Sequence, residues 1–173
     1  MLEAQGHVMA AKDPWNVVRL DPEEHIAGAI VGFSRYVYAK TFGFKNEAGL
    51  EERTYETDIE GACAEIAVAK TFGLYWPFSM RERHAFKDPD LAYTIQVRQS
   101  DKRSLIVRPK DKPEHRYIFA QGKDGTFVIR GWMWGYEAKQ DQYWMEPNGR
   151  PGAWFVPWNK LRHPASVLDV LEE

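Results

Sequence analysis

The chain has 173 residues, of which 44% are hydrophobic and 14% aromatic, and its formal net charge is -2. This length suits one domain with a substantial core, and the apolar content is too high for a disordered chain. A nearly balanced charge excludes a strong overall positive field of the kind that attracts nucleic acid. The single cysteine, Cys63, excludes a disulfide scaffold and a cysteine-based zinc site, and we expect it to be a small buried hydrophobic residue.

Membrane insertion is not expected. No apolar stretch approaches the length that spans a bilayer, and the N-terminus lacks the apolar segment of a signal peptide. We therefore expect a cytoplasmic protein with no membrane partner.

A first helix is predicted after an N-terminal arm over residues 1–20. Asp21 can cap this helix, Pro22 suits its first turn, and Glu24 completes a capping-box pattern. The helix and the loop after it fill residues 21–56. Its apolar residues recur at helical spacing and are Ile26, Ala29, Ile30, Phe33 and Val37.

A second helix is predicted from Thr57 or Asp58 to Phe72, with Gly73 as its C-terminal cap. The residues expected to face the core are Ile59, Ala62, Cys63, Ile66 and Ala69. With the strands that follow, this helix forms an expected core over residues 57–135.

Strand patterns begin near residue 93. The segments YTIQVRQ and SLIVR predict two strands, and Asp124-Gly125 predicts a tight turn between two further alternating runs. The segment over residues 136–173 is rich in tryptophan, and we interpret the tryptophans mainly as core, although exposed ones could stack on unpaired bases. The layout predicts a single domain of the α/β (α+β) class, with a mixed central sheet and helices packed on it.

Glu65 is the first candidate for a functional role. Its neighbours three and four residues away on the helix are small or apolar: Gly61, Ala62, Val68 and Ala69. A carboxylate in such surroundings needs a cation, a hydrogen-bond donor or a metal. A salt bridge to an arginine at the edge of the core and a metal ligand are both compatible with this pattern.

Three more polar residues extend the candidate site. Asp90 could supply a second carboxylate, Gln96 a neutral oxygen ligand, and Arg98 a cation that stabilises charge on phosphorus. Gln96 and Arg98 alternate with Ile95 and Val97, so they share one face of the predicted strand. Such a set suits an Mg²⁺ or Mn²⁺ ion held by Glu65, Asp90 and Gln96.

Several segments together resemble small phage-borne proteins related to the PD-(D/E)XK nuclease superfamily. The resemblance covers residues 57–164 and rests on GACAEIAVAKTFGLYW, FKDPDLAYTIQVRQ, LIVRPKD, YIFAQG, FVIRGW and WFVPWNKLRHP. It implies a restriction-endonuclease-like fold with a tryptophan-rich C-terminal extension, a magnesium site, and duplex or branched DNA as substrate. It also implies a location in the cytoplasm of the host cell. Carried over residue by residue, the catalytic roles fall on Glu65, Asp90, Gln96 and Arg98.

Two of these positions depart from the superfamily pattern. Gln96 stands where an acid is usual, which removes one negative charge from the metal site. Arg98 stands where lysine is usual, and an arginine can hold a phosphate but cannot act as a general base. Activation of water would then depend on the metal or on Glu65.

The backbone sets a further condition on this site. In one extended strand Asp90 and Gln96 would lie about 20 Å apart, at ~3.3 Å per residue, and one metal cannot join them. The chain must therefore turn between Leu91 and Tyr93. Pro89 favours a turn just upstream.

The sequence leaves three functions open. The first is a metal-dependent DNA endonuclease or exonuclease, and the second is an inactive protein of the same fold that binds nucleic acid or a phage or host protein. The third is an interaction module with a tryptophan-rich interface, and a homodimer is open in each case. Candidate DNA-binding residues form a local basic stripe, namely Arg98, Lys102, Arg103 and Arg108.

Overall fold

The computed structural model describes residues 17–44, 54–80, 89–91 and 94–169. Its two long helices are α1 (Pro22–Phe42) and α2 (Tyr55–Phe72), and two short ones are α3 (Gly135–Ala138) and α4 (Ser166–Asp169). The strands are β1 (Val17–Arg19), β2 (Ile95–Ser100), β3 (Ser104–Val107), β4 (Arg116–Lys123), β5 (Thr126–Trp134), β6 (Trp144–Met145) and β7 (Ala153–Pro157). Two single 3-10 turns, Asp141–Tyr143 and Trp158–Lys160, precede β6 and follow β7.

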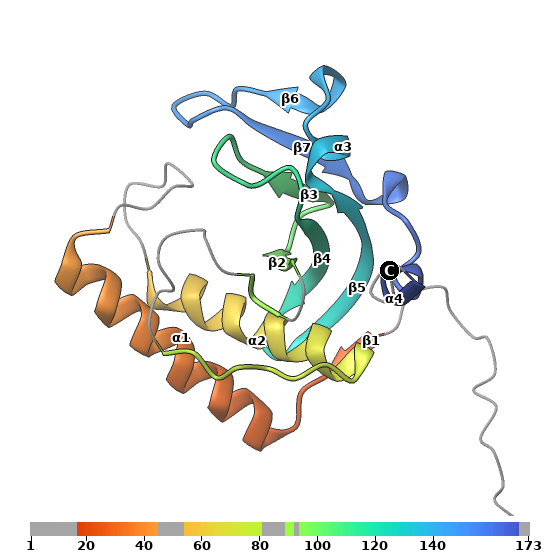
Figure 1. The fold of residues 1–173 in the computed structure, drawn as a ribbon. Helices are drawn as coiled ribbons and strands as arrows, with labels where there is room; N and C mark the ends of the chain where they lie inside the picture. The colour runs from red at the N-terminus through yellow and green to blue at the C-terminus, as the bar shows by residue number, and fades with distance from the viewer. Residues whose placement is uncertain (1–16, 45–53, 81–88, 92–93, 170–173) are drawn as a thin grey trace, which may run out of the picture.

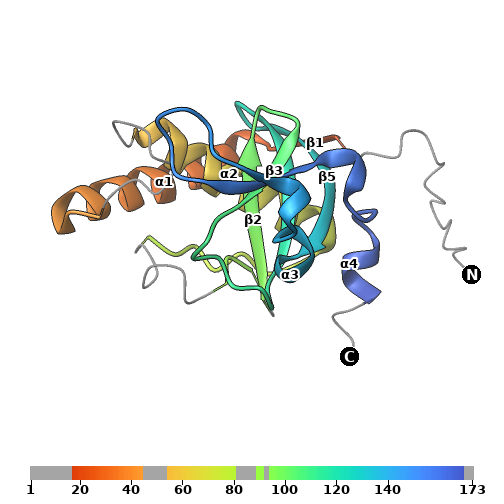
Figure 2. The same cartoon turned by 90° about the horizontal axis from the view of Figure 1, so that it is seen from above.

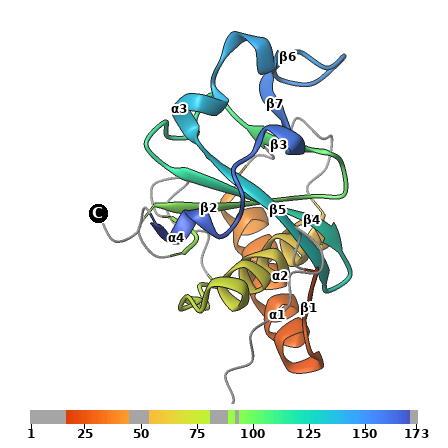
Figure 3. The ribbon, with the colours of Figure 1, turned by 90° about the vertical axis from the view of Figure 1, so that its right-hand side faces the viewer.

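These elements form layers, which Figures 1 and 3 show from two sides. One sheet has the strand order β1-β5-β4-β2, in which β2 runs parallel to β4 and the other pairs are antiparallel. The antiparallel strands β3, β7 and β6 form a second sheet over one face of the first, and Figure 2 views the molecule from that side. The helix α2 packs on the opposite face, and α1 packs outside α2.

The helix α1 begins as its sequence predicts. The Asp21 side chain accepts a hydrogen bond from the Glu24 N–H, and the Glu24 carboxylate accepts one from the Asp21 N–H, so the predicted capping box is confirmed. The helix ends at Gly43 in the left-handed conformation. Both ends are fixed by residues within one turn of the terminus.

Close contact between α1 and α2 depends on two glycines of α1. A methyl group on Gly32 would lie 2.3 Å from Ile59 Cα, and one on Gly28 would lie 2.5 Å from Cys63 Sγ. The backbones therefore approach each other more closely than side chains allow. The residues that α1 buries are consequently small or of medium size: Gly28, Val31, Gly32 and Ala39.

The predicted apolar run of α1 lies on its other side. The larger apolar residues of this run are exposed, namely Ile26, Ile30, Phe33 and Val37. Their spacing nevertheless predicted the helix correctly. An apolar run at helical spacing is usually the buried face. Here the glycine face is buried instead, because it alone permits the close approach to α2.

The helix α2 lies between α1 and the first sheet and is buried on nearly every side. It begins at Tyr55 with Thr54 as its N-cap, two residues before the predicted start, and it ends at Gly73 as predicted. Ile59 is only partly buried, whereas the other predicted core residues of this helix are buried. Cys63 is buried and free, as predicted, and burial raises the pKa of its thiol to about 12.

The side chains of β2 alternate between the two faces of the first sheet. Ile95 and Val97 pack with α2 in the core between helix and sheet. Gln96 lies beside Tyr117 of β4 in the parallel register, and Tyr117 belongs to the core between the two sheets. Paired residues of neighbouring strands point to the same face. Gln96 and Arg98 therefore face the second sheet, away from α2.

The observed class is α+β with a mixed first sheet. The predicted turn between β4 and β5 is confirmed, because Asp124 and Gly125 both have positive φ. The expectation of helices around one central sheet differs from the structure, since a second sheet covers the face opposite α2. Of the helices within the described ranges, none combines the length and apolar character needed to cross a bilayer.

Candidate functional site

Glu65 is held by an arginine of the neighbouring helix. Arg35 donates from both terminal nitrogens to the two oxygens of Glu65, at 2.5 and 2.9 Å, and from Nε to the Ser79 carbonyl at 3.0 Å. The Trp76 indole N–H donates to Glu65 Oε2 at 3.0 Å. The Glu65 side chain is only 7% exposed. Its buried charge is therefore satisfied by a bidentate ion pair and an indole hydrogen bond.

Asp90 and Leu91 lie beside the first residues of β2, so the chain reverses direction between Leu91 and Ile95. The Leu91 N–H donates to the Ile95 carbonyl at 3.2 Å, and the Val97 N–H donates to Asp90 Oδ2 at 2.7 Å. Residues 92 and 93 of the predicted turn lie outside the described residues, whereas both sides of the turn are placed. Thr94 completes it with φ +112°, a conformation that a β-branched residue rarely adopts.

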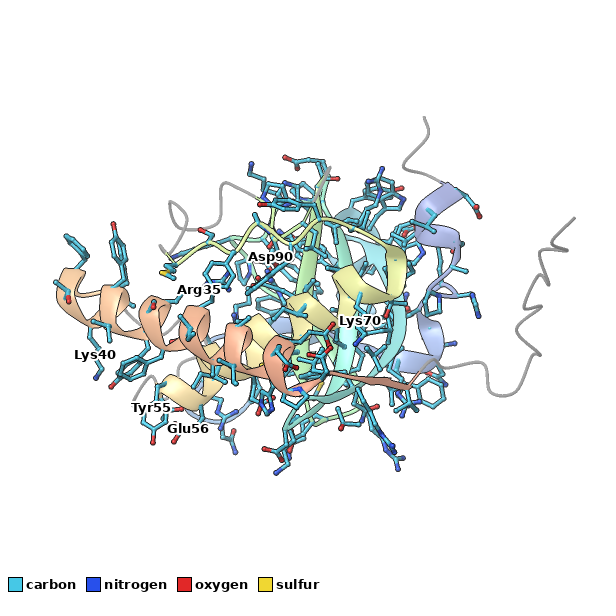
Figure 4. The ribbon with its side chains drawn as sticks, turned by 90° about the horizontal axis from the view of Figure 1, so that it is seen from below. Arg35, Lys40, Tyr55, Glu56, Lys70 and Asp90 are labelled. Atoms are coloured by element: carbon cyan, nitrogen blue, oxygen red, sulfur yellow. The ribbon has the colours of Figure 1, made fainter. Side chains whose placement is uncertain are left out.

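Asp90 and Glu65 form a pair of interacting carboxylates. Burial and then the charge of Glu65 raise the pKa of Asp90 to about 7, against the opposing effects of Arg98, the Val97 N–H and Arg35. Figure 4 shows Arg35 and Asp90 on the same side of α1. A buried carboxyl group whose pKa is raised towards neutrality by burial and by a second acid is typical of functional sites, although structural ion pairs also shift pKa values.

Replacing Asp90 by asparagine should change how stability depends on pH. An unfolded aspartate has a pKa near 4, whereas folding raises that of Asp90 to about 7. Between these values the folded state binds the proton more tightly, so the free energy of unfolding of the wild type falls as the pH rises. Denaturant unfolding should be measured for both proteins at about pH 5 and about pH 8. Between these pH values the free energy of unfolding of the wild type should fall by about 1 to 3 kcal/mol more than that of the variant.

The matched control for this measurement is Asp101→Asn, because the Asp101 side chain is 59% exposed. Its pH dependence should follow that of the wild type. If Asp90→Asn also followed the wild type, the carboxylate pair would not carry the raised pKa.

Arg98 forms an ion pair with Asp111 on the side of the sheet opposite Glu65. It donates to Asp111 Oδ1 at 2.8 Å and to the Val97 carbonyl at 3.2 Å, and it lies 5.1 Å above the Tyr117 ring. Asp111 is buried and also accepts from the Arg108 N–H at 2.8 Å. Arg98 and the buried Asp111 therefore form a structural ion pair, which also fixes the turn at Arg108.

The four predicted catalytic residues are thus divided by the sheet. Glu65 lies on the helix side, and Asp90 lies at the edge of β2, where it senses charges on both sides. Gln96 is buried on the second-sheet side together with Arg98. The structure brings Glu65 and Asp90 together, and it does not place Gln96 with them.

The predicted basic stripe is also divided. Lys102 and Arg103 are exposed in the turn between β2 and β3, where Lys102 lies 3.4 Å from Asp101. Arg108 is half-buried beside Asp111, and Arg98 is held in its ion pair. Only the two residues of the turn have the exposure that contact with a phosphate requires.

The donor atoms of the site accommodate a hard cation in part. Glu65 Oε2 accepts two hydrogen bonds and Oε1 accepts one, so Oε1 keeps one lone pair. Asp90 keeps more acceptor capacity, because Val97 is its hydrogen-bond donor among the described residues. Within those residues no group of three or more histidine, cysteine, aspartate or glutamate side chains is arranged to hold a metal. Two carboxylates are therefore the available protein ligands.

Three residues of the site could not be found from the sequence. Arg35 and Trp76 reach Glu65 from 30 and 11 residues away, and Asp111 reaches Arg98 from 13 residues away. None of them stands at a motif spacing. The apolar surroundings of Glu65 did indicate that it needs a partner, and the predicted alternative of an arginine salt bridge is the one observed.

Comparisons of the chain with protein-family models, with curated proteins and with solved structures found no match. The geometry described above is therefore the basis for any functional proposal.

Proposed function

We propose that this chain is a divergent relative of the PD-(D/E)XK nucleases, with a restriction-endonuclease-like core, that hydrolyses DNA phosphodiester bonds with Mg²⁺ or Mn²⁺. One observation carries this proposal: the buried carboxyl group of Asp90 interacts electrostatically with Glu65 and lies at the edge of β2 with no ion pair of its own among the described residues. Among the described residues, Glu65 is paired with Arg35 on the helix side of the sheet and Asp111 with Arg98 on the other side, and Asp90 between these two ion pairs is the carboxylate that no ion pair neutralises. A proton or a cation at Asp90 removes this charge, and a hard divalent cation prefers carboxylate oxygens.

The protein residues would divide the work of such a site. Asp90 and Glu65 would hold the ion, and Arg35 would keep Glu65 in place through its bidentate ion pair. When bound, the ion would lower the pKa of a water molecule and stabilise charge on the phosphate. Arg98 would act as a positioning residue through Asp90 and Asp111, because its guanidinium is already paired.

DNA would contact the molecule at the turn between β2 and β3. Lys102 and Arg103 are exposed there, in the turn that follows the strand carrying Gln96 and Arg98. Exposed cations on a turn suit contact with the phosphate backbone, which needs no base recognition. Such a protein would act in the cytoplasm of a phage-infected host cell.

A second candidate is a protein of the same fold that binds DNA or a partner protein without cleaving. The observation in its favour is the Arg35 clamp, which occupies three of the four lone pairs of Glu65 together with Trp76. A carboxylate held in this way can serve stability alone. The two candidates differ in their response to divalent cations.

Addition of Mn²⁺ or Mg²⁺ should raise the melting temperature of the wild type and support cleavage of duplex, branched or single-stranded DNA. Binding to the folded state alone stabilises it by mass action. In Asp90→Asn both effects should be lost, with the cleavage rate reduced at least ~100-fold, because the variant removes a charged ligand. Asp141→Asn is the control and should retain both effects, since Asp141 is exposed in the 3-10 turn before β6, outside the proposed metal and DNA contacts.

Two other results would redirect the proposal. Salt-sensitive DNA binding with neither cleavage nor a metal-dependent melting temperature would establish the second candidate and contradict the first. A protein indifferent to both metal and DNA would contradict both and favour an interaction module.

A further inference from the structure

The outward face of α1 carries a continuous apolar stripe. Its residues follow one another at alternating spacings of three and four along the helix, which keeps them on one side. We define the heptad stripe as Glu23, Ile26, Ile30, Phe33, Val37 and Lys40. The four apolar members are exposed by 59%, 47%, 51% and 45% in chain order. Scattered exposed apolar residues are ordinary, but an unbroken row along a helix indicates a contact surface.

The stripe belongs to the outermost layer of the described structure. The opposite side of α1 packs on α2 through its glycines, so most of the stripe faces outward, while one edge of the Phe33 ring meets Tyr55 of α2 at 6.2 Å between ring centres. Figure 4 views the molecule from this side, with α1 in front. Beside the C-terminal half of the stripe lies a recess of about 480 Å³ lined by Phe33, Ser34, Val37, Tyr38, Thr41, Phe42 and Met80. This recess can accept apolar side chains from a partner.

The ends of the stripe carry opposite charges at equal distances from its centre. Glu23 lies seven residues before Ile30, and Lys40 lies seven residues after Phe33. A second copy turned by 180° about the point between Ile30 and Phe33 would place Ile30 against Phe33 and Ile26 against Val37. Each Glu23 would then face a Lys40 of the other copy. This arrangement makes the stripe complementary to itself.

We propose that the heptad stripe is the interface of a homodimer in which two α1 helices pack antiparallel about this twofold axis. Antiparallel packing also sets opposed helix dipoles side by side, which is favourable. An interface of this kind uses the same patch on both copies, as a twofold axis requires. Since a single helix pair is a small interface, we expect a dissociation constant in the range of about 1 to 100 µM.

Sedimentation or light scattering of the full chain should show a monomer–dimer equilibrium between about 1 and 300 µM. Phe33→Glu should weaken the dimer at least ~100-fold, because it buries two unpaired carboxylates at the centre of the interface. Met145→Glu is the matched control, since Met145 is 55% exposed on β6 in the second sheet, on the far side of the molecule from α1. It should dimerise as the wild type does.

Charge exchange tests the antiparallel register. Glu23→Lys and Lys40→Glu should each weaken the dimer about tenfold, because each variant places like charges opposite each other at two symmetric positions. The double variant should regain the wild-type dissociation constant, because the pairing is restored with reversed signs. In a parallel dimer, each residue would face its own copy, so the double exchange would restore nothing.

Three outcomes would overturn the proposal. These are a monomeric wild type at every concentration, a dimer that Phe33→Glu leaves intact, and single charge variants whose effects the double variant does not cancel. The circular dichroism spectrum of each variant separates loss of dimer from loss of fold. None of these readouts depends on the proposed nuclease activity.

Discussion

Glu65→Gln is expected to lower the free energy of unfolding by about 3 kcal/mol, because it removes the bidentate ion pair of the half-buried Arg35. Among the described residues, Arg35 is then left with only the charges of Asp90 and Asp58, to which it donates no hydrogen bond. The change keeps the shape of the side chain, so cavity formation is not the cause. Arg35 joins α1 to α2 through Glu65 and to the segment after α2 through the Ser79 carbonyl. Loss of the ion pair should therefore loosen three parts of the structure together.

The measurement is denaturant unfolding of the wild type and the variant at one pH. Glu114→Gln is the control, because Glu114 is exposed and its replacement should change stability by less than ~0.5 kcal/mol. The double variant Arg35→Met, Glu65→Met should be less destabilised than the sum of Arg35→Met and Glu65→Met, since it removes both members of the ion pair together. Equal stability of Glu65→Gln and wild type would mean that the ion pair does not hold the helices.

Gly32→Ala should also destabilise the protein severely, by about 3 kcal/mol or more, because the new methyl group collides with backbone atoms. It would lie 2.3 Å from Ile59 Cα and 2.5 Å from Ile59 N. Backbone atoms of a helix cannot rotate aside as a side chain can. The only relief is to separate α1 from α2, which would pull Arg35 away from Glu65.

Gly61→Ala is the matched control for this variant. Gly61 lies within α2, and apart from the adjacent backbone of its own helix no atom lies within 4 Å of the position of its added methyl group. Since alanine has the higher helix propensity, this variant should be more stable than the wild type by about 0.5 to 1 kcal/mol. Thermal and denaturant unfolding distinguish the two cases. Similar stability changes in both variants would contradict close packing of the helices at Gly32.

These two variants also connect the fold to the candidate site. Gly32 sets the distance between the helices, and Arg35 lies one turn further along α1. The approach that glycine permits is what allows the guanidinium to reach Glu65. The ion pair that holds Glu65 in place therefore depends on Gly32, which has no functional side chain.

Local structure was predicted well from the sequence, because it is decided within a few residues. The caps at Asp21 and Gly73 belong to this class. So does the turn at Asp124 and Gly125, whose positive φ values suit these residue types. The reversal before β2 was required by the candidate site, and Asp90 does return to Val97.

The tertiary structure alone decided which faces meet. The apolar run of α1 predicted the helix but not its orientation, because close packing on α2 favours the glycine face over the larger apolar one. The alternation of side chains along β2 predicted that Gln96 and Arg98 share one face of the strand. That Glu65 lies on the other side of the sheet follows only from the packing of α2 there. Partners such as Arg35 and Asp111 come from distant parts of the chain, and sequence spacing carries no information on such encounters. The sequence by itself determined the local elements, whereas the layers and the ion pairs between them arise only when those elements pack.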